Sequence, residues 1–259
     1  MRTLTLTKHH GLGNDFLVFV DHNDEFGDDH AAMARALCDR HRGIGADGLI
    51  RLGPYLRMHL HNADGSRAEM SGNGIRCLAQ AIVDHGLTDE TEFEIETDAG
   101  TKWVRIGEPH AASGLGMFTR EITVDMGPAR IVESTAGERA VVDMGNPHLV
   151  LPDEGQDLLA LGAQHPEVNV ELISTTGNGD LAMRVHERGV GVTQACGTGS
   201  CASAAAAHAW GWVGTAATVH NPGGAVSVEL KDETVFLTGP ATFIARVDVL
   251  WPGEPSERP

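Results

Sequence analysis

Two short stretches of the chain place a side chain that can carry a proton directly before a glycine-rich helix start. Ser71 precedes Gly-Asn-Gly at 72–74, and Cys196 precedes Gly-Thr-Gly at 197–199. The first amides of a helix have no partners within the helix, and the helix dipole places partial positive charge there. Glycine lets a ligand approach that backbone closely. Both stretches are therefore candidate sites for an anion such as a carboxylate.

The pairing of Ser71 with Cys196 indicates a particular reaction. If the two helix N-termini face one another, one carboxylate accepts hydrogen bonds from both, with the two side chains on opposite sides of it. Removing a proton from one face of the neighbouring carbon and delivering one to the other face inverts an α-carbon. The carbanion needs concentrated stabilisation, which two helix N-termini supply. Because a helix N-terminus lowers the pKa of a thiol from about 8.5, Cys196 is the expected base. A buried structural cysteine is the alternative.

The elements around the two glycine-rich helix starts repeat along the chain. Each glycine-opened helix is followed by two alternating strands around a tight turn, at 98–100 and at 222–224. Ser71 lies 29 residues before Gly100, and Cys196 lies 28 residues before Gly224. One structural unit therefore occurs twice. Other alternating or helical patterns predict strands at 3–8, 16–20, 57–62 and 241–251, and a helix over 28–40 with an aspartate N-cap.

This repetition predicts an α/β (α+β) fold of two pseudo-symmetric halves. The Ala-rich central helix of each half lacks a polar face, so we expect it to be buried, with a mostly antiparallel sheet wrapped around it. The N-terminal half is assigned to 1–112 and the C-terminal half to 113–244, with the poorly patterned stretch 107–116 as the joint. The last stretch, 245–259, is expected to pack back on the first half. The active site is expected in the cleft between the halves.

Composition excludes several classes of protein. The 259 residues carry a formal net charge of −17, with 36 acidic and 19 basic residues, and show no Lys/Arg cluster for nucleic acid. No segment approaches the roughly 18 apolar residues that a membrane span needs. Four cysteines are too few for a disulfide scaffold, which favours a cytoplasmic protein with free thiols. His59 and His61 share a strand face, but no third ligand accompanies them, so we predict no metal site.

Six sequence blocks, in order, carry a resemblance to a known family. They are HGLGNDF (10–16), CDRHRGIGADGL (38–49), NADGSRAEMSGNGIRC (62–77), DMGNPH (143–148), VHERGVGVTQACGTGSCA (185–202) and TGPA (238–241). The chain resembles the diaminopimelate epimerases along essentially its whole length. The resemblance implies an isomerase that interconverts LL- and meso-diaminopimelate in lysine and peptidoglycan-precursor synthesis. It also implies that neither pyridoxal phosphate nor a metal is used, and that the fold is similar to that of proline racemases.

The resemblance also implies roles for individual residues. Cys196 and Ser71 would be the acid/base pair, and Glu187 and His148 would tune them. The amides of four residues would hold the α-carboxylate: Gly72, Asn73, Gly197 and Thr198. Six side chains would bind the amino and carboxylate groups: Asn14, Asn62, Asn146, Asn169, Glu187 and Arg188.

Two positions depart from the family. Ser71 stands where the family has its second cysteine, and Gly48, which offers only backbone, stands where some members bind substrate with glutamine. A related racemase for another amino acid, or a catalytically impaired paralogue that only binds an amino acid, are therefore alternatives. Retention of Cys196 argues against binding alone, because binding needs no thiol. The expected partner is a small-molecule substrate, and the expected assembly is a homodimer.

Overall fold

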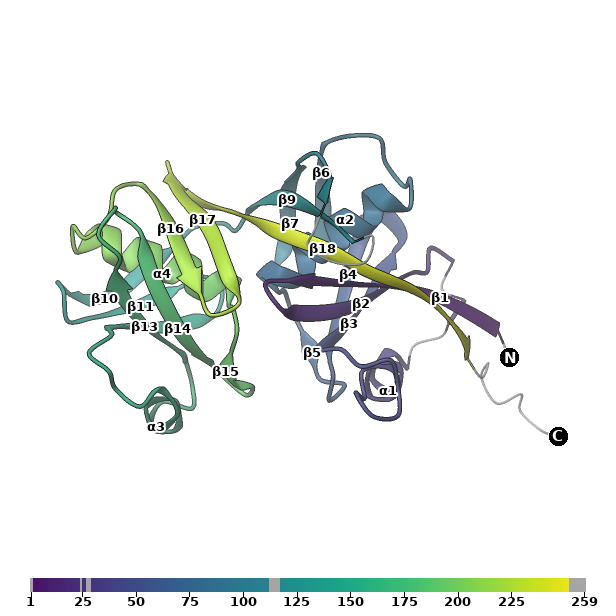
Figure 1. Cartoon of the computed structure of the whole chain (residues 1–259), viewed down its shortest axis with the longest axis horizontal. Helices are drawn as coiled ribbons and strands as arrows, with labels where there is room; N and C mark the ends of the chain where they lie inside the picture. The colour runs from purple at the N-terminus through teal and green to yellow at the C-terminus, as the bar shows by residue number, and fades with distance from the viewer. Residues whose placement is uncertain (1, 24, 27–28, 112–116, 252–259) are drawn as a thin grey trace. The chain divides into compact units, whose positions relative to one another are not determined.

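The computed structural model describes residues 2–23, 25–26, 29–111 and 117–251 (Figure 1). By its internal contacts the chain forms two compact units. Unit 1 comprises residues 1–122 and 240–259, and unit 2 comprises residues 123–239. The boundary expected between residues 112 and 113 falls outside the described residues, as do the second half of the expected joint and positions 252–259.

Unit 1 is a barrel of strands around one helix. Its strands are β1 (Arg2–Gly11), β2 (Asn14–Val20), β3 (Gly48–Gly53), β4 (Arg57–Asn62), β5 (Arg67–Ala68), β6 (Glu92–Thr97), β7 (Gly100–Ile106), β8 (His110–Ala111), β9 (Phe118–Asp125) and the end of β18 (Thr234–Trp251). Pairing runs β1–β2–β3–β4–β6–β7–β9–β18 and returns to β1, which closes the barrel. Its helices are α1 (His30–Leu37), the short 3₁₀ turn η1 (Pro54–Leu56) and α2 (Gly72–Asp84).

Helix α2 lies inside this barrel. It contacts β1, β2, β3, β4 and β7, and every residue from 72 to 82 is buried (Figure 1). The prediction of a buried central helix is confirmed. Helix α1 is shorter than the predicted 28–40, because the chain turns after Cys38, where the Asp39 carboxylate accepts the His41 and Arg42 amides.

Unit 2 repeats this arrangement around α4 (Gly197–Ala209). Its other elements are β10 (Arg130–Thr135), β11 (Arg139–Asp143), β12 (Pro147–Pro152), α3 (Leu158–Gln164), β13 (Asn169–Thr175), β14 (Leu181–Glu187), β15 (Gly191–Thr193), β16 (Ala216–Asn221), β17 (Gly224–Lys231) and the start of β18. Pairing runs β10–β11–β12–β13–β14–β16–β17–β18. Helix α4 contacts β10 to β14, β16 and β17, and all but three of its thirteen residues are buried.

The two units share one topology. In unit 1, the neighbours β2–β3 and β4–β6 are parallel, and α1 and α2 make the respective crossovers. In unit 2, β12–β13 and β14–β16 are parallel, and α3 and α4 make the crossovers. Parallel neighbours cannot be joined by a tight hairpin, so each pair requires such a connection. The repeated unit and the mostly antiparallel α/β class predicted from the sequence are confirmed.

None of the helices in the described part of the chain has the length and apolarity that a bilayer crossing requires.

Candidate active site

Cys196 and Ser71 are the N-caps of the two central helices. Cys196 has extended backbone (φ −128°, ψ 119°), and its Sγ accepts the Gly199 amide at 3.3 Å. Ser71 has nearly the same backbone (φ −137°, ψ 126°), and its Oγ accepts the Gly74 amide at 3.1 Å. An N-cap side chain satisfies an amide that the helix itself leaves unpaired. The sequence prediction that both residues open a helix is confirmed.

The last glycine of each Gly-x-Gly stretch is required by close packing. A Cβ added at Gly199 would lie 2.6 Å from Oε1 of Glu171 and 3.3 Å from Sγ of Cys196. A Cβ added at Gly74 would lie 3.2 Å from Cβ of Ser71. Glycine therefore lets the cap side chain fold over the first turn, and at Gly199 it also admits a buried carboxylate.

The environment of Cys196 contradicts one expectation from the sequence. Burial raises the pKa of the Cys196 thiol well above its usual range, and the nearby carboxylates of Glu187 and Glu171 raise it further. Hydrogen bonds from Thr198 and the Gly199 amide act in the opposite direction but are outweighed. The lowered pKa predicted from the helix N-terminus is therefore wrong, since one helix dipole supplies only about 0.3–1 kcal/mol, up to about 2. Cys196 is a protonated thiol at neutral pH.

Glu187, the last residue of β14, is the carboxylate that contacts this thiol. It accepts a hydrogen bond from Thr193 Oγ1 at 2.5 Å and shares one with Cys196. Burial raises the pKa of Glu187, and these two hydrogen bonds lower it in part. Thiol and carboxyl thus both hold protons more tightly than they would in water.

His148, on β12, links a second carboxylate to the site. Its Nδ1 lies 2.7 Å from Oε1 of Glu171, and both side chains are fully buried. Its Nε2 lies 3.0 Å from Oδ1 of Asn146. Sequence reasoning missed Glu171; the signal that could have found it is a charged residue between the apolar residues Val170 and Leu172.

Asn169 ties the start of β13 to the end of β14. Its Nδ2 donates to the Pro147 carbonyl at 3.2 Å, and its Oδ1 accepts the Arg188 amide at 2.9 Å. The Arg188 guanidinium donates to the Glu167 carbonyl at 3.5 Å. Unit 2 therefore connects five of the predicted site residues at the N-terminus of α4, which begins at the predicted Gly197: Asn146, His148, Glu187, Cys196 and Thr198. Asn169 and Arg188 contact each other, and no hydrogen bond in the described part of the chain links them to this helix.

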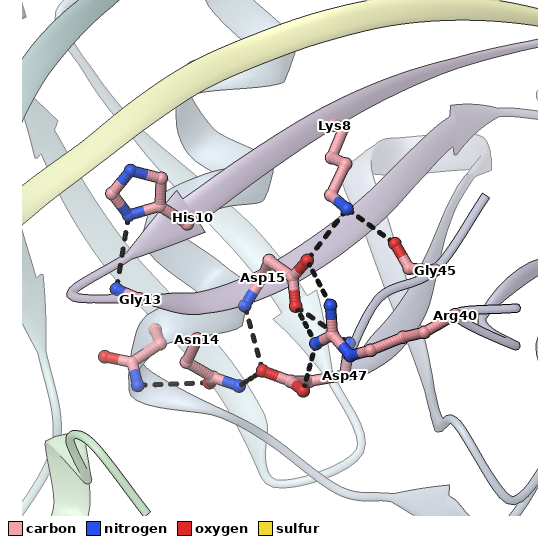
Figure 2. Close-up of polar contacts among 9 residues, drawn as sticks. Lys8, His10, Gly13, Asn14, Asp15, Arg40, Gly45 and Asp47 are labelled. Atoms are coloured by element: carbon pink, nitrogen blue, oxygen red, sulfur yellow. Dashed lines mark hydrogen bonds and ion pairs between the residues drawn. The ribbon is translucent and has the colours of Figure 1, made fainter. Parts of the chain in front are cut away.

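Unit 1 orients Asn14 through a charged network that includes Asp15, Arg40 and Asp47 (Figure 2). Asn73 Nδ2 donates to Asn14 Oδ1 at 3.1 Å, and Asn14 Nδ2 donates to Asp47 Oδ2 at 2.8 Å. Arg40 bridges Asp47 at 2.7 Å and Asp15 at 2.6 Å. Both ends of the Asn14 carboxamide are therefore fixed. Asp47 and Arg40 lie within one of the six sequence blocks but were not predicted to belong to the site.

Burial disfavours the charge of Asp15 in this network. Hydrogen bonds from Arg40 and Lys8 outweigh that effect and hold the pKa of Asp15 below its usual range. The carboxylate therefore stays ionised at neutral pH and anchors Arg40 beside Asp47.

Gly48 and Asn62 are paired residues on neighbouring strands β3 and β4. The Asn62 side chain donates to Ser66 Oγ at 2.9 Å, within the turn that follows β4. A Cβ at Gly48 would lie 2.9 Å from the His61 carbonyl oxygen and 3.1 Å from the Phe16 ring. This backbone has no room for a larger residue, so position 48 offers a ligand only its peptide groups.

The described residues contain no group of three or more His, Cys, Asp or Glu side chains that could hold a metal ion. The four cysteines, Cys38, Cys77, Cys196 and Cys201, are all free and buried.

Comparison with known proteins decides the family. The sequence model described as diaminopimelate epimerase matches residues 6–132 and 140–244. The chain belongs to the diaminopimelate epimerase family. The diaminopimelate epimerase of Agathobacter rectalis is 38% identical over 95% of this chain and 100% of its own length. That of Desulforudis audaxviator is 39% identical over 92% and 96%, and that of Mycobacterium tuberculosis is 38% identical over 95% and 97%.

Solved structures with the fold of this diaminopimelate epimerase family member are more distant in sequence. A phenazine biosynthesis protein of the PhzF family from Bacillus anthracis aligns with a TM-score of 0.74 and 16% identity, over 97% of this chain and 100% of that one. A hydroxyproline epimerase from Agrobacterium vitis, solved with bound trans-4-hydroxy-L-proline, aligns with a TM-score of 0.69 and 17% identity, over 96% and 91%. At these identities the likeness establishes the fold alone.

Proposed function

We propose that this isomerase interconverts LL- and meso-diaminopimelate in lysine biosynthesis, by removing the α-proton and reprotonating the opposite face of the carbon. The observation that carries the proposal is Cys196, which caps a glycine-opened helix beside Glu187 in a chain of the diaminopimelate epimerase family. A binding protein has no need of a thiol at this position.

Four backbone amides would hold the substrate's α-carboxylate: Gly72, Asn73, Gly197 and Thr198. Each lies in the first turn of a central helix, where amides lack partners within the helix. The carbanion that forms next to that carboxylate is stabilised by preorganised N–H groups and by the two helix dipoles. No charge has to be moved into place during the reaction.

Cys196 would serve one face of the α-carbon. As a protonated thiol it delivers its Sγ proton to the carbanion, and the thiolate left behind takes the proton of the Glu187 carboxyl group. In the reverse direction the thiol passes its proton to the Glu187 carboxylate, and the resulting thiolate takes the α-proton. The hydrogen bond between Glu187 and Cys196 provides the path for this transfer.

Ser71 would serve the other face. An alcohol can donate a proton to a carbanion or relay one through water, but it ionises far less readily than a thiol with a pKa near 8.5. Proton abstraction through Ser71 would therefore be the slow step of inversion. The equivalent N-cap geometry of Ser71 and Cys196 supports the assignment of the two faces.

Selectivity for diaminopimelate would come from its distal end. Arg188 can bind a carboxylate through a planar guanidinium, and four asparagines can bind carboxylate or ammonium groups: Asn14, Asn62, Asn146 and Asn169. The fixed carboxamides of Asn14 and Asn169 support this assignment, because a preorganised amide loses little freedom on binding.

A related racemase for a different amino acid is the second candidate. The observation that favours it is Gly48, where packing leaves no room for the glutamine with which some family members bind substrate. The experiment below separates the two candidates by their substrates.

We also propose that the enzyme needs neither pyridoxal phosphate nor a metal, and that it acts as a homodimer in the cytoplasm. No lysine occurs in the blocks 62–77 and 185–202, so no amine in these blocks can form a Schiff base. Dimerisation rests on the general preference of enzymes for two-fold assemblies. Measuring the molecular mass of the protein in solution tests the proposed dimer.

The proposed function is tested by proton NMR in D₂O. Enzyme dialysed against EDTA and treated with hydroxylamine is incubated separately with LL-diaminopimelate, meso-diaminopimelate, proline and glutamate. The expected result is loss of the α-proton signal, with formation of the other diastereomer, for diaminopimelate only. Exchange with another amino acid instead supports the second candidate, and no exchange with any substrate contradicts both. Activity that returns only on addition of metal or pyridoxal phosphate contradicts cofactor independence.

A further inference from the structure

Glu171 is a buried carboxylate that the proposed reaction does not use. Its side chain is 0% exposed, and Oε1 lies 2.7 Å from His148 Nδ1. Its other oxygen, Oε2, has no hydrogen-bond partner among the described residues. Burying a charged carboxylate in such a position is unfavourable unless hydrogen bonds and charges compensate it. A residue kept under these conditions calls for a role beyond packing.

A chain of polar contacts leads from Glu171 to the reactive thiol. His148 connects Glu171 to Asn146 through its two ring nitrogens, at 2.7 and 3.0 Å. Asn146 Nδ2 donates to Thr198 Oγ1 at 3.5 Å, and Thr198 Oγ1 lies 3.5 Å from Cys196 Sγ. The contacts therefore run from β13 through β12 to the first turn of α4.

The space for Glu171 is built into the first turn of α4. Oε1 lies 2.6 Å from where a Cβ at Gly199 would be, so any larger residue at 199 would displace the carboxylate. The third residue of the Gly-Thr-Gly stretch thus serves two purposes. It lets Cys196 cap the helix, and it lets Glu171 reach His148.

We propose that Glu171 is a positioning residue of this site: it fixes the His148 ring through Nδ1, and His148 fixes the carboxamide of Asn146 through Nε2. A carboxylate can only accept a hydrogen bond, so the nitrogen that faces it carries the proton. The other nitrogen, Nε2, faces the Asn146 oxygen, which is also an acceptor, so both ring nitrogens donate in this geometry and Nε2–H holds the oxygen end of the carboxamide toward His148. The opposite end is presented to Thr198. The part of this inference that concerns catalysis rests on the proposed function.

Two substitutions separate this role from simple packing. Glu171→Leu keeps a side chain of similar size but removes the acceptor, so His148 should lose the proton on Nδ1 and keep the one on Nε2 that faces Asn146 Oδ1. Glu171→Gln retains an acceptor for Nδ1–H without the charge. The matched control is Glu167→Gln, which neutralises an exposed carboxylate 3.9 Å from His165 in the same unit.

The first measurement reads the His148 tautomer by NMR of protein labelled with ¹⁵N in its histidine rings, without substrate. His148→Asn identifies the signal. We expect Nδ1 to be protonated in the parent and in Glu167→Gln, and to lose its proton in Glu171→Leu. A parent spectrum with an unprotonated Nδ1 overturns the proposal, whether or not the leucine variant folds.

The second measurement is the rate of α-proton exchange of diaminopimelate in D₂O, with the melting temperature recorded for each variant. Glu171→Leu should lower the rate at least about tenfold while it remains folded, and Glu171→Gln should recover most of that loss. An unchanged rate in Glu171→Leu overturns the positioning role. A parent that exchanges no α-proton of diaminopimelate contradicts the proposed function instead, and the tautomer then decides the role of Glu171.

Discussion

Ser71 and Cys196 occupy the same position of the same motif. Each is the N-cap of a thirteen-residue helix buried within its own unit, and each accepts the amide of the glycine three residues later, at 3.1 and 3.3 Å. Their backbone angles differ by less than about 10°. The two helix N-termini therefore carry equivalent amides but chemically unequal side chains, and this inequality is the basis of the central prediction.

Arg188→Lys should raise the KM for diaminopimelate. A lysine supplies a point charge in place of a planar fork that matches a carboxylate at two points. Losing one hydrogen bond to a charged group costs roughly 1.5–3 kcal/mol, which is about a tenfold to hundredfold increase. The control is Arg184→Lys on β14, the strand that ends just before Arg188, because Arg184 pairs with Asp153 at 2.8 Å. Steady-state kinetics check the prediction. An unchanged KM in Arg188→Lys would mean that the guanidinium does not bind the substrate.

Asp47→Asn should also raise the KM, by about threefold to tenfold. The Asn14 carboxamide then loses a charge-assisted hydrogen bond, worth about 1 kcal/mol more than a neutral one. Asp98→Asn is the matched control, because it breaks a comparable ion pair with Arg67 at 2.6 Å in the same unit. If both variants have the parent KM, Asp47 does not orient Asn14 for binding.

The stability of the fold should fall between pH 6.5 and pH 4 in part because of His9. Burial lowers the pKa of His9 to about 4, against the opposing effect of the hydrogen bond that its Nδ1 donates to Gln80 Oε1. In this window the unfolded chain binds a proton that the folded chain does not, so unfolding becomes easier as the pH falls. The shift corresponds to about 3 kcal/mol, as an order of magnitude.

His9→Gln removes this titration. The difference in the free energy of unfolding between pH 7 and pH 4.5, measured with urea, should shrink in His9→Gln and remain as in the parent in the exposed control His22→Gln. Part of the slope should persist, because burial and nearby arginines also lower the pKa of His59 to about 4. An undiminished difference in His9→Gln would show that His9 does not contribute.

Glu187→Gln should lower the pKa of Cys196. Glu187 is, after burial, the largest cause of the raised pKa of that thiol, so removing its charge favours the thiolate. Alkylation of Cys196 by iodoacetamide, followed by peptide mapping across pH 6 to 10, should therefore begin at a lower pH in the variant. The α-proton exchange rate should fall in the same variant, because the thiol has lost its proton acceptor. An unshifted alkylation profile means that Glu187 does not act on Cys196.

The sequence predicted the repeated unit well, because its signals are local. The glycines before α2 and α4, the alternation in β6 and β7, and the turn between β16 and β17 each follow from neighbouring residues. The charge environment could not be predicted in this way. The pKa of Cys196 depends on Glu171 and Glu187, which arrive from two different strands, and on burial by the surrounding sheet. The helix N-terminus alone therefore predicted a lowered pKa for Cys196, where the structure gives a raised one.

Polar contacts between residues far apart in the chain could not be predicted from the sequence either. Asp47 and Asn14 lie 33 residues apart, and His148 and Glu171 lie 23 residues apart. Each pair is brought together by parallel strands whose register is set by the crossover helix between them. A glutamate within a strand such as β13 is expected to be exposed until the contact of α4 with that strand is known.

The most direct test of the unequal faces is the exchange and inversion of LL- and meso-diaminopimelate in D₂O, assayed separately with three proteins. In the parent we expect α-proton exchange on the face served by Cys196 to be faster than inversion. Ser71→Cys should raise the inversion rate at least about tenfold, a barrier change near 1.4 kcal/mol, and Cys196→Ser should abolish both exchange and inversion. A parent that inverts both substrates as fast as Ser71→Cys would contradict this account, because serine would then be a competent base.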